Sequence, residues 1–120
     1  MPDWTNLKMN ENCPRKNFRY AAEGRITVTV QRSEGKLSFW GLIANLSRTG
    51  IASTVVGNLS VGEIVTLRFS PTPKSLEVQV RARVSHQRGY YCGFEFLWLS
   101  DADRRSVEQA CAELSRKWQG

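Results

Sequence analysis

Two short motifs carry side chains suited to binding a charged or polar ligand. Arg15 and Arg19 form an RxxxR motif, and each guanidinium can donate two parallel hydrogen bonds to a phosphate or to a guanine edge. Asn45, Ser47 and Gly50 form an NxSxxG motif that offers an amide carbonyl, a hydroxyl and a glycine. We expect this glycine to adopt a positive φ or to permit close approach of a ligand to the strand, with turn geometry alone as the alternative. Each motif alone is a weak signal, because the first is common in Arg-rich chains and the second also suits an ordinary turn.

The charge of the chain favours an anionic partner. The 120 residues include 17 Lys and Arg against 11 Asp and Glu, which gives a net charge of +6 and a pI near 9.7. This balance is compatible with a nucleic acid, a nucleotide or a phospholipid, and does not choose among them. The length allows one domain, so multidomain enzymes are excluded.

Cysteine and histidine usage argues against a disulfide framework, a metal centre and an active site. Cys13, Cys92 and Cys111 are odd in number and form no CxxC motif, and His86 is the one histidine. No nucleophile, base and orienting group come together in the sequence. We therefore expect a non-catalytic cytoplasmic protein without metal, and with no signal peptide or membrane-inserted segment.

The elements that must position the two motifs are short strands. The alternation is clearest in residues 78–85, where every second residue is apolar. Cys92 shares a face with Phe94 and Phe96, so we expect it to be a buried small hydrophobe. Six such segments separated by turn residues predict a mainly β protein, a six-stranded antiparallel barrel. The predicted strands span residues 25–31, 37–44, 50–56, 64–69, 78–85 and 90–97.

A helix is expected after the last strand. Ser100 and Asp103 resemble a capping box with Asp in place of Glu, and the helical pattern runs to about Trp118. Its apolar stripe predicts packing against the sheet, with a partner-binding helix as the alternative. The stripe consists of Val107, Ala110, Cys111, Leu114 and Trp118.

Together and in this order, the two motifs resemble the signature of the PilZ domain, a bacterial receptor module for the cyclic dinucleotide c-di-GMP. Residues 45–51 are similar to the family's "niSxxGi" motif. Residues 61–63 are similar to the family's loop before a strand, and residues 93–96 to its closing "GxxF" strand. The likeness spans residues 14–118 and leaves residues 1–13 as a flexible N-terminal arm. The family fold, a six-stranded barrel with a C-terminal helix, agrees with the periodicity.

The resemblance implies a c-di-GMP site built from Arg15, Arg19, Asn45, Ser47 and Gly50. The ligand presents two phosphates and two guanines to the two arginine forks. The Asn45 carbonyl could accept a hydrogen bond from guanine, and the Ser47 hydroxyl could contact a phosphate or a guanine. Many family members have Asp at the first position, so the neutral Asn forfeits a charge-assisted bond and lowers the expected affinity.

Lys16 and His86 are secondary candidates for ligand contact. His86 ends a strand whose alternate residues point inward, which favours a core or rim histidine. The alternative is that the turn at residues 87–89 twists His86 outward, where its ring could stack on a guanine. Pro14, directly before the first motif arginine, can neither donate a hydrogen bond nor pair with a second ligand, so we expect one c-di-GMP per chain.

These features predict a non-catalytic receptor that binds c-di-GMP and changes conformation to signal to an unidentified downstream protein. No cofactor other than this ligand is expected, and no specific nucleic acid. Two alternatives stay open: a general single-stranded nucleic-acid-binding barrel, which the net charge would favour, and a PilZ-like adaptor that binds no nucleotide.

Overall fold

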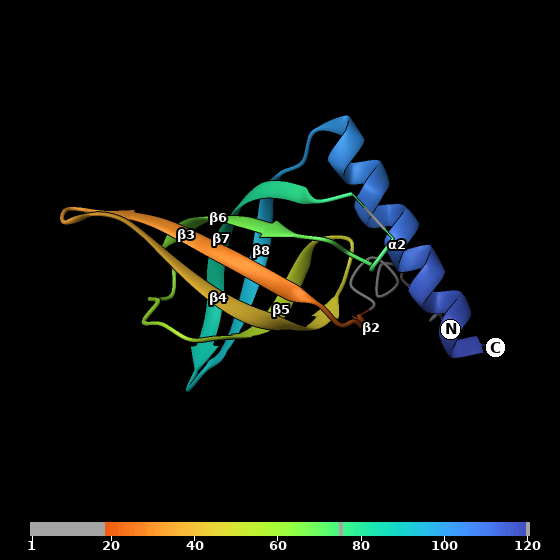
Figure 1. Ribbon diagram of the computed structural model, residues 1–120, viewed down its shortest axis with the longest axis horizontal. Helices are drawn as coiled ribbons and strands as arrows, with labels where there is room; N and C mark the ends of the chain where they lie inside the picture. The colour runs from red at the N-terminus through yellow and green to blue at the C-terminus, as the bar shows by residue number, and fades with distance from the viewer. Residues whose placement is uncertain (1–18, 75, 120) are drawn as a thin grey trace, which may run out of the picture.

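The computed structural model describes residues 19–74 and 76–119 as a closed antiparallel barrel with one helix (Figure 1). Six strands follow the order β4-β3-β6-β7-β8-β5, and β5 pairs with β4 to close the barrel. A short outer strand, β2, pairs with the end of β4. The strands are β2 (Tyr20–Ala21), β3 (Arg25–Arg32), β4 (Gly35–Leu46), β5 (Gly50–Val55), β6 (Ile64–Phe69), β7 (Val78–Arg88) and β8 (Tyr91–Trp98). The predicted six-stranded barrel is therefore confirmed, and β2 is an addition to it.

The barrel forms because one face of each strand is apolar. In β7 the alternation is regular from Val78 to Val84, with buried Val and Ala between exposed Gln and Arg. Inward side chains from all six strands fill the interior and leave Phe69 and Phe94 fully buried. Cys92 is buried beside them as predicted, and this burial raises the pKa of its thiol.

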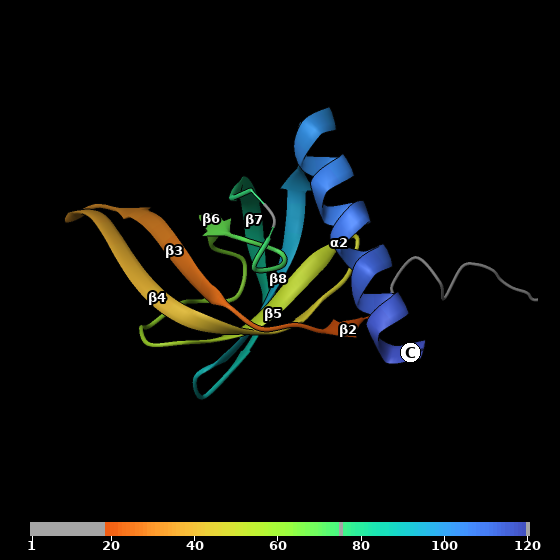
Figure 2. The same ribbon diagram turned by 45° about the vertical axis from the view of Figure 1, so that its right-hand side comes forward.

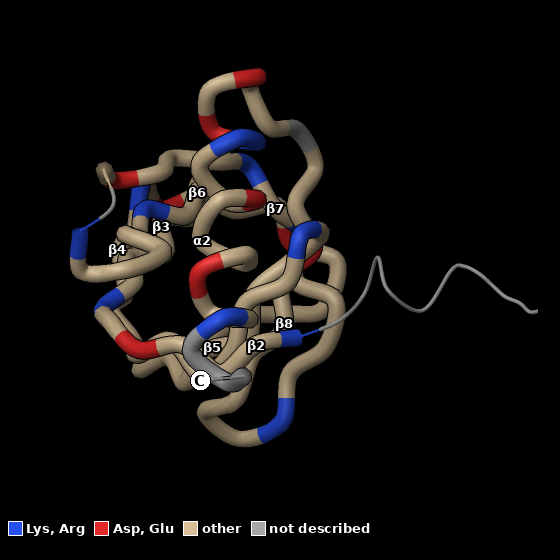
Figure 3. Tube along the Cα trace, turned by 90° about the vertical axis from the view of Figure 1, so that its right-hand side faces the viewer, with Lys and Arg blue, Asp and Glu red and all other residues tan. Residues whose placement is uncertain are grey.

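Helix α2 (Asp101–Gln119) lies across one end of the barrel (Figures 2 and 3). The Ser100 hydroxyl accepts a hydrogen bond from the backbone N–H of Asp103 at 3.1 Å, as the predicted cap requires. The helix buries Val107, Ala110, Cys111 and Leu114. These four residues of the predicted stripe thus pack against the barrel end, and the Trp118 side chain lies outside the described part of the chain. The burial also raises the pKa of the Cys111 thiol to about 11.

Two irregularities in strand pairing affect the positions of candidate site residues. The register between β4 and β5 shifts between Ile43 and Asn45, and the register between β7 and β8 shifts between Val84 and His86. A bulge inserts a residue that redirects the side chains after it. Each shift therefore changes which side of the barrel the following residues face.

Candidate functional site

The two sequence motifs meet on the outside of the barrel. Strand β2 pairs with β4 so that Ala21 lies opposite Asn45, and this pairing brings Arg19 beside the Asn45 side chain. Arg19 donates a hydrogen bond from Nη1 to Asn45 Oδ1 at 2.7 Å. Arg19 is exposed and Asn45 is half-buried, so the contact lies open to solvent. Arg15 and Lys16, together with the predicted arm over residues 1–13, lie outside the described residues.

Ser47 forms the turn between β4 and β5. Its hydroxyl accepts hydrogen bonds from the backbone N–H groups of Thr49 at 3.2 Å and Gly50 at 3.1 Å, and donates to the Gly50 carbonyl at 3.2 Å. The Ser47 backbone N–H also donates to that carbonyl, at 2.9 Å. A serine hydroxyl has one proton and two lone pairs, so this turn uses all of them. Ser47 is 1% exposed, and its side chain fixes the loop between the two strands.

Gly50 is needed for strand pairing, and the prediction that it adopts a positive φ is wrong. The positive-φ glycines of the described chain are Gly24, Gly35, Gly62 and Gly89. Gly50 lies opposite Glu95 of β8, and a Cβ at this position would run into a backbone carbonyl of that strand. The close approach that this glycine permits is therefore between β5 and β8.

Two small residues that face outward but are buried lie next to the motif residues. Asn45 lies opposite Ala52, Ala52 opposite Gly93, and Gly93 opposite His86, which makes one row across β4, β5, β8 and β7. We call these four residues the Asn45 row. Ala52 and Gly93 carry no bulky side chain, but both are buried, and the His86 ring occupies the space outside Gly93. A planar group could therefore approach the strands here only if that ring moved aside. Sequence reasoning missed both as site residues, although Gly93 belongs to the GxxF pattern.

His86 is exposed on the outer surface, so the prediction that it lies in the core is wrong. The register shift after Val84 turns it away from the core, and its ring lies where a Cβ on Gly93 would be. The ring also stacks on Tyr91, with centroids 5.7 Å apart and an angle of 30° between the planes. His86 therefore faces outward as the alternative predicted, and its ring lies within the Asn45 row. The cause is the bulge after Val84 and not a turn at residues 87–89, because β7 continues to Arg88.

Ion pairs distinguish Arg19 from several other arginines. Arg48, in the turn after Ser47, pairs with Glu108 of helix α2 at 3.0 Å and connects the turn to the helix. In the described part of the chain, no ion pair is found for Arg19, whose Nη1 is hydrogen-bonded to the neutral amide of Asn45. A guanidinium has five N–H donors, so further donors remain available to an anionic group.

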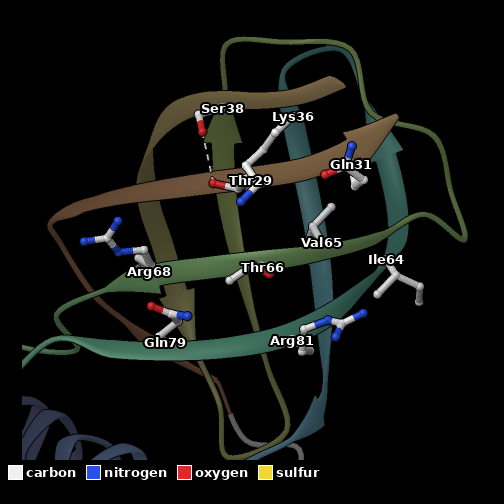
Figure 4. Close-up of a pocket in the computed structure, with 10 residues that line it drawn as sticks. All are labelled: Thr29, Gln31, Lys36, Ser38, Ile64, Val65, Thr66, Arg68, Gln79 and Arg81. Carbon is white, nitrogen blue, oxygen red and sulfur yellow. Dashed lines mark hydrogen bonds between the residues drawn. The ribbon is translucent and has the colours of Figure 1, made fainter. Parts of the chain in front are cut away.

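A second surface depression lies on β3, β4, β6 and β7, away from the motif residues (Figure 4). It is an open groove of about 430 Å³ with a cationic and hydroxyl-rich lining. Arg68 and Arg81 lie along it, and Thr29 and Ser38 share a hydrogen bond at 3.1 Å at its edge.

Residues 19–74 and 76–119 contain no cluster of His, Cys, Asp and Glu suited to a metal ion. Within the same ranges, no helix is both long and apolar enough to cross a membrane.

Comparison with known proteins assigns the family. The model of the PilZ domain matches residues 14–113 of the 120. The chain belongs to the PilZ domain family. No curated protein matched the sequence. Among solved structures, this PilZ chain resembles the PilZ domain of CeSA from a cellulose-synthesizing bacterium, with a TM-score of 0.64 and 20% identity over 82% of this chain and 98% of that one.

Two longer proteins contain a similar barrel. YcgR from Escherichia coli, solved in complex with c-di-GMP, matches with a TM-score of 0.67 and 16% identity over 85% of this chain and 46% of YcgR. MotI, an inhibitor of motility from Bacillus subtilis, matches with a TM-score of 0.64 and 18% identity over 82% of this chain and 49% of MotI. At these identities the structures show a shared fold. The PilZ chain spans about half the length of each of these two proteins.

Proposed function

We propose that this PilZ chain is a non-catalytic cytoplasmic receptor that binds c-di-GMP and signals to a partner protein. The observation that carries the proposal is the 2.7 Å hydrogen bond from Arg19 to Asn45, which joins the RxxxR and NxSxxG motifs on one exposed surface. The complex of YcgR with c-di-GMP supports it, because that protein has the same fold.

The chemistry of the ligand matches the groups around Asn45. Each guanine of c-di-GMP exposes a paired acceptor edge, and each phosphate carries a negative charge, so both suit an arginine fork. Arg19 is held in place by Asn45, and Arg15, four residues earlier, would supply a second fork from the chain segment that precedes β2. The second lone pair of the Asn45 carbonyl can accept from a guanine N–H.

The small residues of the Asn45 row would let a base lie close to the barrel once the His86 ring moves aside. That ring lies over Gly93, and Ala52 is buried, so the ring would have to rotate away before a base could contact them, after which it could stack on the base. Because Asn45 is neutral, the site forfeits a charge-assisted hydrogen bond, so we expect Asn45→Asp to raise the affinity for c-di-GMP.

Ser47 and Gly50 act in this proposal by holding the site in shape. Direct contact of Ser47 with the ligand would require one of its hydrogen bonds in the turn to break. Gly50 keeps β5 close to β8 and so keeps Ala52 level with Gly93. Both residues therefore set the position of Asn45 relative to the other three residues of the Asn45 row.

Calorimetric titration tests the proposal. The parent protein should bind c-di-GMP more tightly than GMP, with one ligand per chain. Arg15→Lys and Arg19→Lys should each weaken binding about tenfold or more, since an ammonium keeps the charge but loses the planar fork. Arg81→Lys, on the groove of Figure 4, is the matched control and should bind as the parent does. Equal affinity for GMP, or parent-like binding by both Lys variants of the motif, would refute the proposed site.

The groove supports one second candidate, single-stranded nucleic-acid binding. Its cationic side chains, Lys36, Arg68 and Arg81, could follow a phosphate backbone. In that case a short oligonucleotide should bind with strong salt dependence, and Lys36→Ala with Arg81→Ala should weaken binding and reduce the salt slope by about two. Absence of binding to either ligand would instead favour an adaptor that works through protein contacts alone.

A further inference from the structure

A row of exposed side chains with arginine at each end crosses five strands beside the Asn45 row. Leu42 of β4 lies opposite Thr54 of β5, and Thr54 lies opposite Tyr91 of β8. The row ends on Arg25 of β3, opposite Leu42, and on Arg88 of β7, opposite Tyr91. All five residues are exposed, and Leu42 is 52% exposed. The row therefore presents an uncharged and partly apolar centre, made of Leu42, Thr54 and Tyr91, between two cationic ends.

Three further exposed apolar residues extend this row into a patch. The Val56 backbone N–H donates to the Trp40 carbonyl at 3.1 Å, and the Val55 N–H donates to the Tyr90 carbonyl at 2.8 Å, so Trp40, Val56 and Tyr90 are neighbours. Their exposed fractions are 52%, 55% and 70%. We call these three residues, together with the row from Arg25 to Arg88, the Trp40 surface.

The arginines of the Trp40 surface have no acidic partner in the described chain. Ion pairs there engage Arg32, Arg48, Arg68 and Arg104 with nearby carboxylates. Arg25 instead lies over the Trp40 ring, 5.5 Å from its centroid. A planar guanidinium stacked on an aromatic ring keeps its edge free to receive a carboxylate.

We propose that the Trp40 surface docks a partner protein through a segment in which acidic side chains flank apolar ones. Trp, Tyr and Arg, the residue types that dominate binding energy at protein interfaces, all occur on it. Its exposed apolar side chains would be removed from water by such a partner. The two end arginines are four strand spacings apart, roughly 19 Å at 4.8 Å per spacing along the curved barrel wall, so the acidic groups should be separated by no more than about that distance.

Two other occupants fit the Trp40 surface less well. A second copy of the chain in a symmetric contact would bring its own Arg25 and Arg88 against this cationic row, and like charges repel at short distance. A nucleic acid could stack bases on Trp40, Tyr90 and Tyr91. It would gain little from Leu42 and Val56, however, and the two arginines stand only at the ends of the row, which leaves its middle without charge to follow a phosphate backbone. An acidic and apolar protein segment fits both parts of the surface.

This surface would serve as the output of the proposed receptor, so its role in signalling rests on the proposed function. The Asn45 row and the Trp40 surface are adjacent, and the stacked rings of His86 and Tyr91 connect them. The docking surface itself is defined by exposure and charge, and it does not depend on which nucleotide binds.

Selection from a phage-displayed library of random dodecapeptides tests the proposal. The parent protein should enrich sequences with acidic residues on both sides of aromatic or aliphatic ones. A synthetic peptide of the enriched sequence, followed by fluorescence anisotropy, should bind Leu42→Glu at least tenfold more weakly than the parent. Ile64→Glu is the matched control, because Ile64 is 41% exposed on the lining of the separate groove, and it should bind within twofold of the parent.

Two further measurements separate loss of docking from misfolding, and the docking proposal from the receptor proposal. Tyr90→Ala, at a turn, should weaken peptide binding while leaving the circular dichroism spectrum and c-di-GMP affinity unchanged. If the parent binds the peptide but not c-di-GMP, the proposed function fails and the docking surface stands.

Several results would overturn the docking proposal. The proposal fails if the selection enriches no acidic and apolar sequences, or if Leu42→Glu binds the peptide as the parent does. It also fails if the protein forms a dimer that Leu42→Glu abolishes, or binds an oligonucleotide through Leu42.

Discussion

Replacing Ser47 with alanine separates a structural role of the NxSxxG serine from a ligand contact. In the turn between β4 and β5, the hydroxyl is the acceptor for the Thr49 and Gly50 N–H groups and a donor to the Gly50 carbonyl. The alanine variant removes these three hydrogen bonds and the longer contact with the Thr49 hydroxyl at 3.4 Å, and it adds no steric conflict. The turn should therefore lose stability even when no ligand is present.

The size of the loss follows from which partners are left unpaired. The Gly50 carbonyl keeps its hydrogen bond from the Ser47 backbone N–H at 2.9 Å. The Gly50 N–H lies in a buried residue and loses its acceptor, whereas the Thr49 residue is exposed and can be hydrated. One buried unpaired N–H costs about 1 to 3 kcal/mol, so the free energy of unfolding should fall by about that amount.

Urea unfolding followed by far-UV circular dichroism measures this difference, with two serine-to-alanine controls. Ser53→Ala removes a buried hydroxyl that has no hydrogen-bond partner in the described structure, so the free energy of unfolding should stay unchanged or rise. Ser38→Ala removes an exposed hydroxyl near Thr29 and should change it by less than about 0.5 kcal/mol. The structural role of Ser47 is refuted if its alanine variant unfolds at the same urea concentration as the parent.

Two other predictions concern the barrel wall and the loop after β5. Gly50→Ala should lower the free energy of unfolding by about 1 to 3 kcal/mol, because the new methyl group meets the backbone of β8. Gly93→Ala should lower it less, because the exposed His86 ring can move away. Chemical unfolding that ranks the two variants in the opposite order contradicts this. The hydrogen bond from Arg32 holds the pKa of Glu63 below its ordinary value near 4.5, so this pair stabilises the fold above that pH and less as the pH falls through the lowered pKa. The stability difference between parent and Glu63→Gln should therefore be larger at pH 7 than at pH 3, and a difference that does not change with pH would contradict it.

The strands were predictable because burial on one side of a barrel imposes a period of two. The regular alternation in β7 and the helical stripe of α2 each reflect contact with a single core, and both predictions are confirmed. Strand β2 was missed, since two residues, Tyr20 and Ala21, are too few to show a period. Its position depends on pairing with β4, some 25 residues later in the sequence.

The candidate site was predictable in its residue types and only partly in its geometry. The motifs identified Arg19 and Asn45, and their contact is formed by β2. The outward position of His86 results from the bulge after Val84, which shifts the alternation by one residue. The need for glycine at position 50 could not be predicted from the sequence, because the carbonyl that a side chain there would strike belongs to β8, more than 40 residues away in the sequence.

The arrangement of β8 suggests how a rigid barrel could pass a signal between the two proposed surfaces. Along this strand Cys92 and Phe94 point into the core, while Tyr91 and Gly93 face outward, one on the Trp40 surface and the other in the Asn45 row. A ligand on the Asn45 row would meet His86 above Gly93, and movement of that ring would change its stacking on Tyr91. The tightly packed core resists deformation, so the coupling would be carried by exposed side chains and not by rearrangement of the strands.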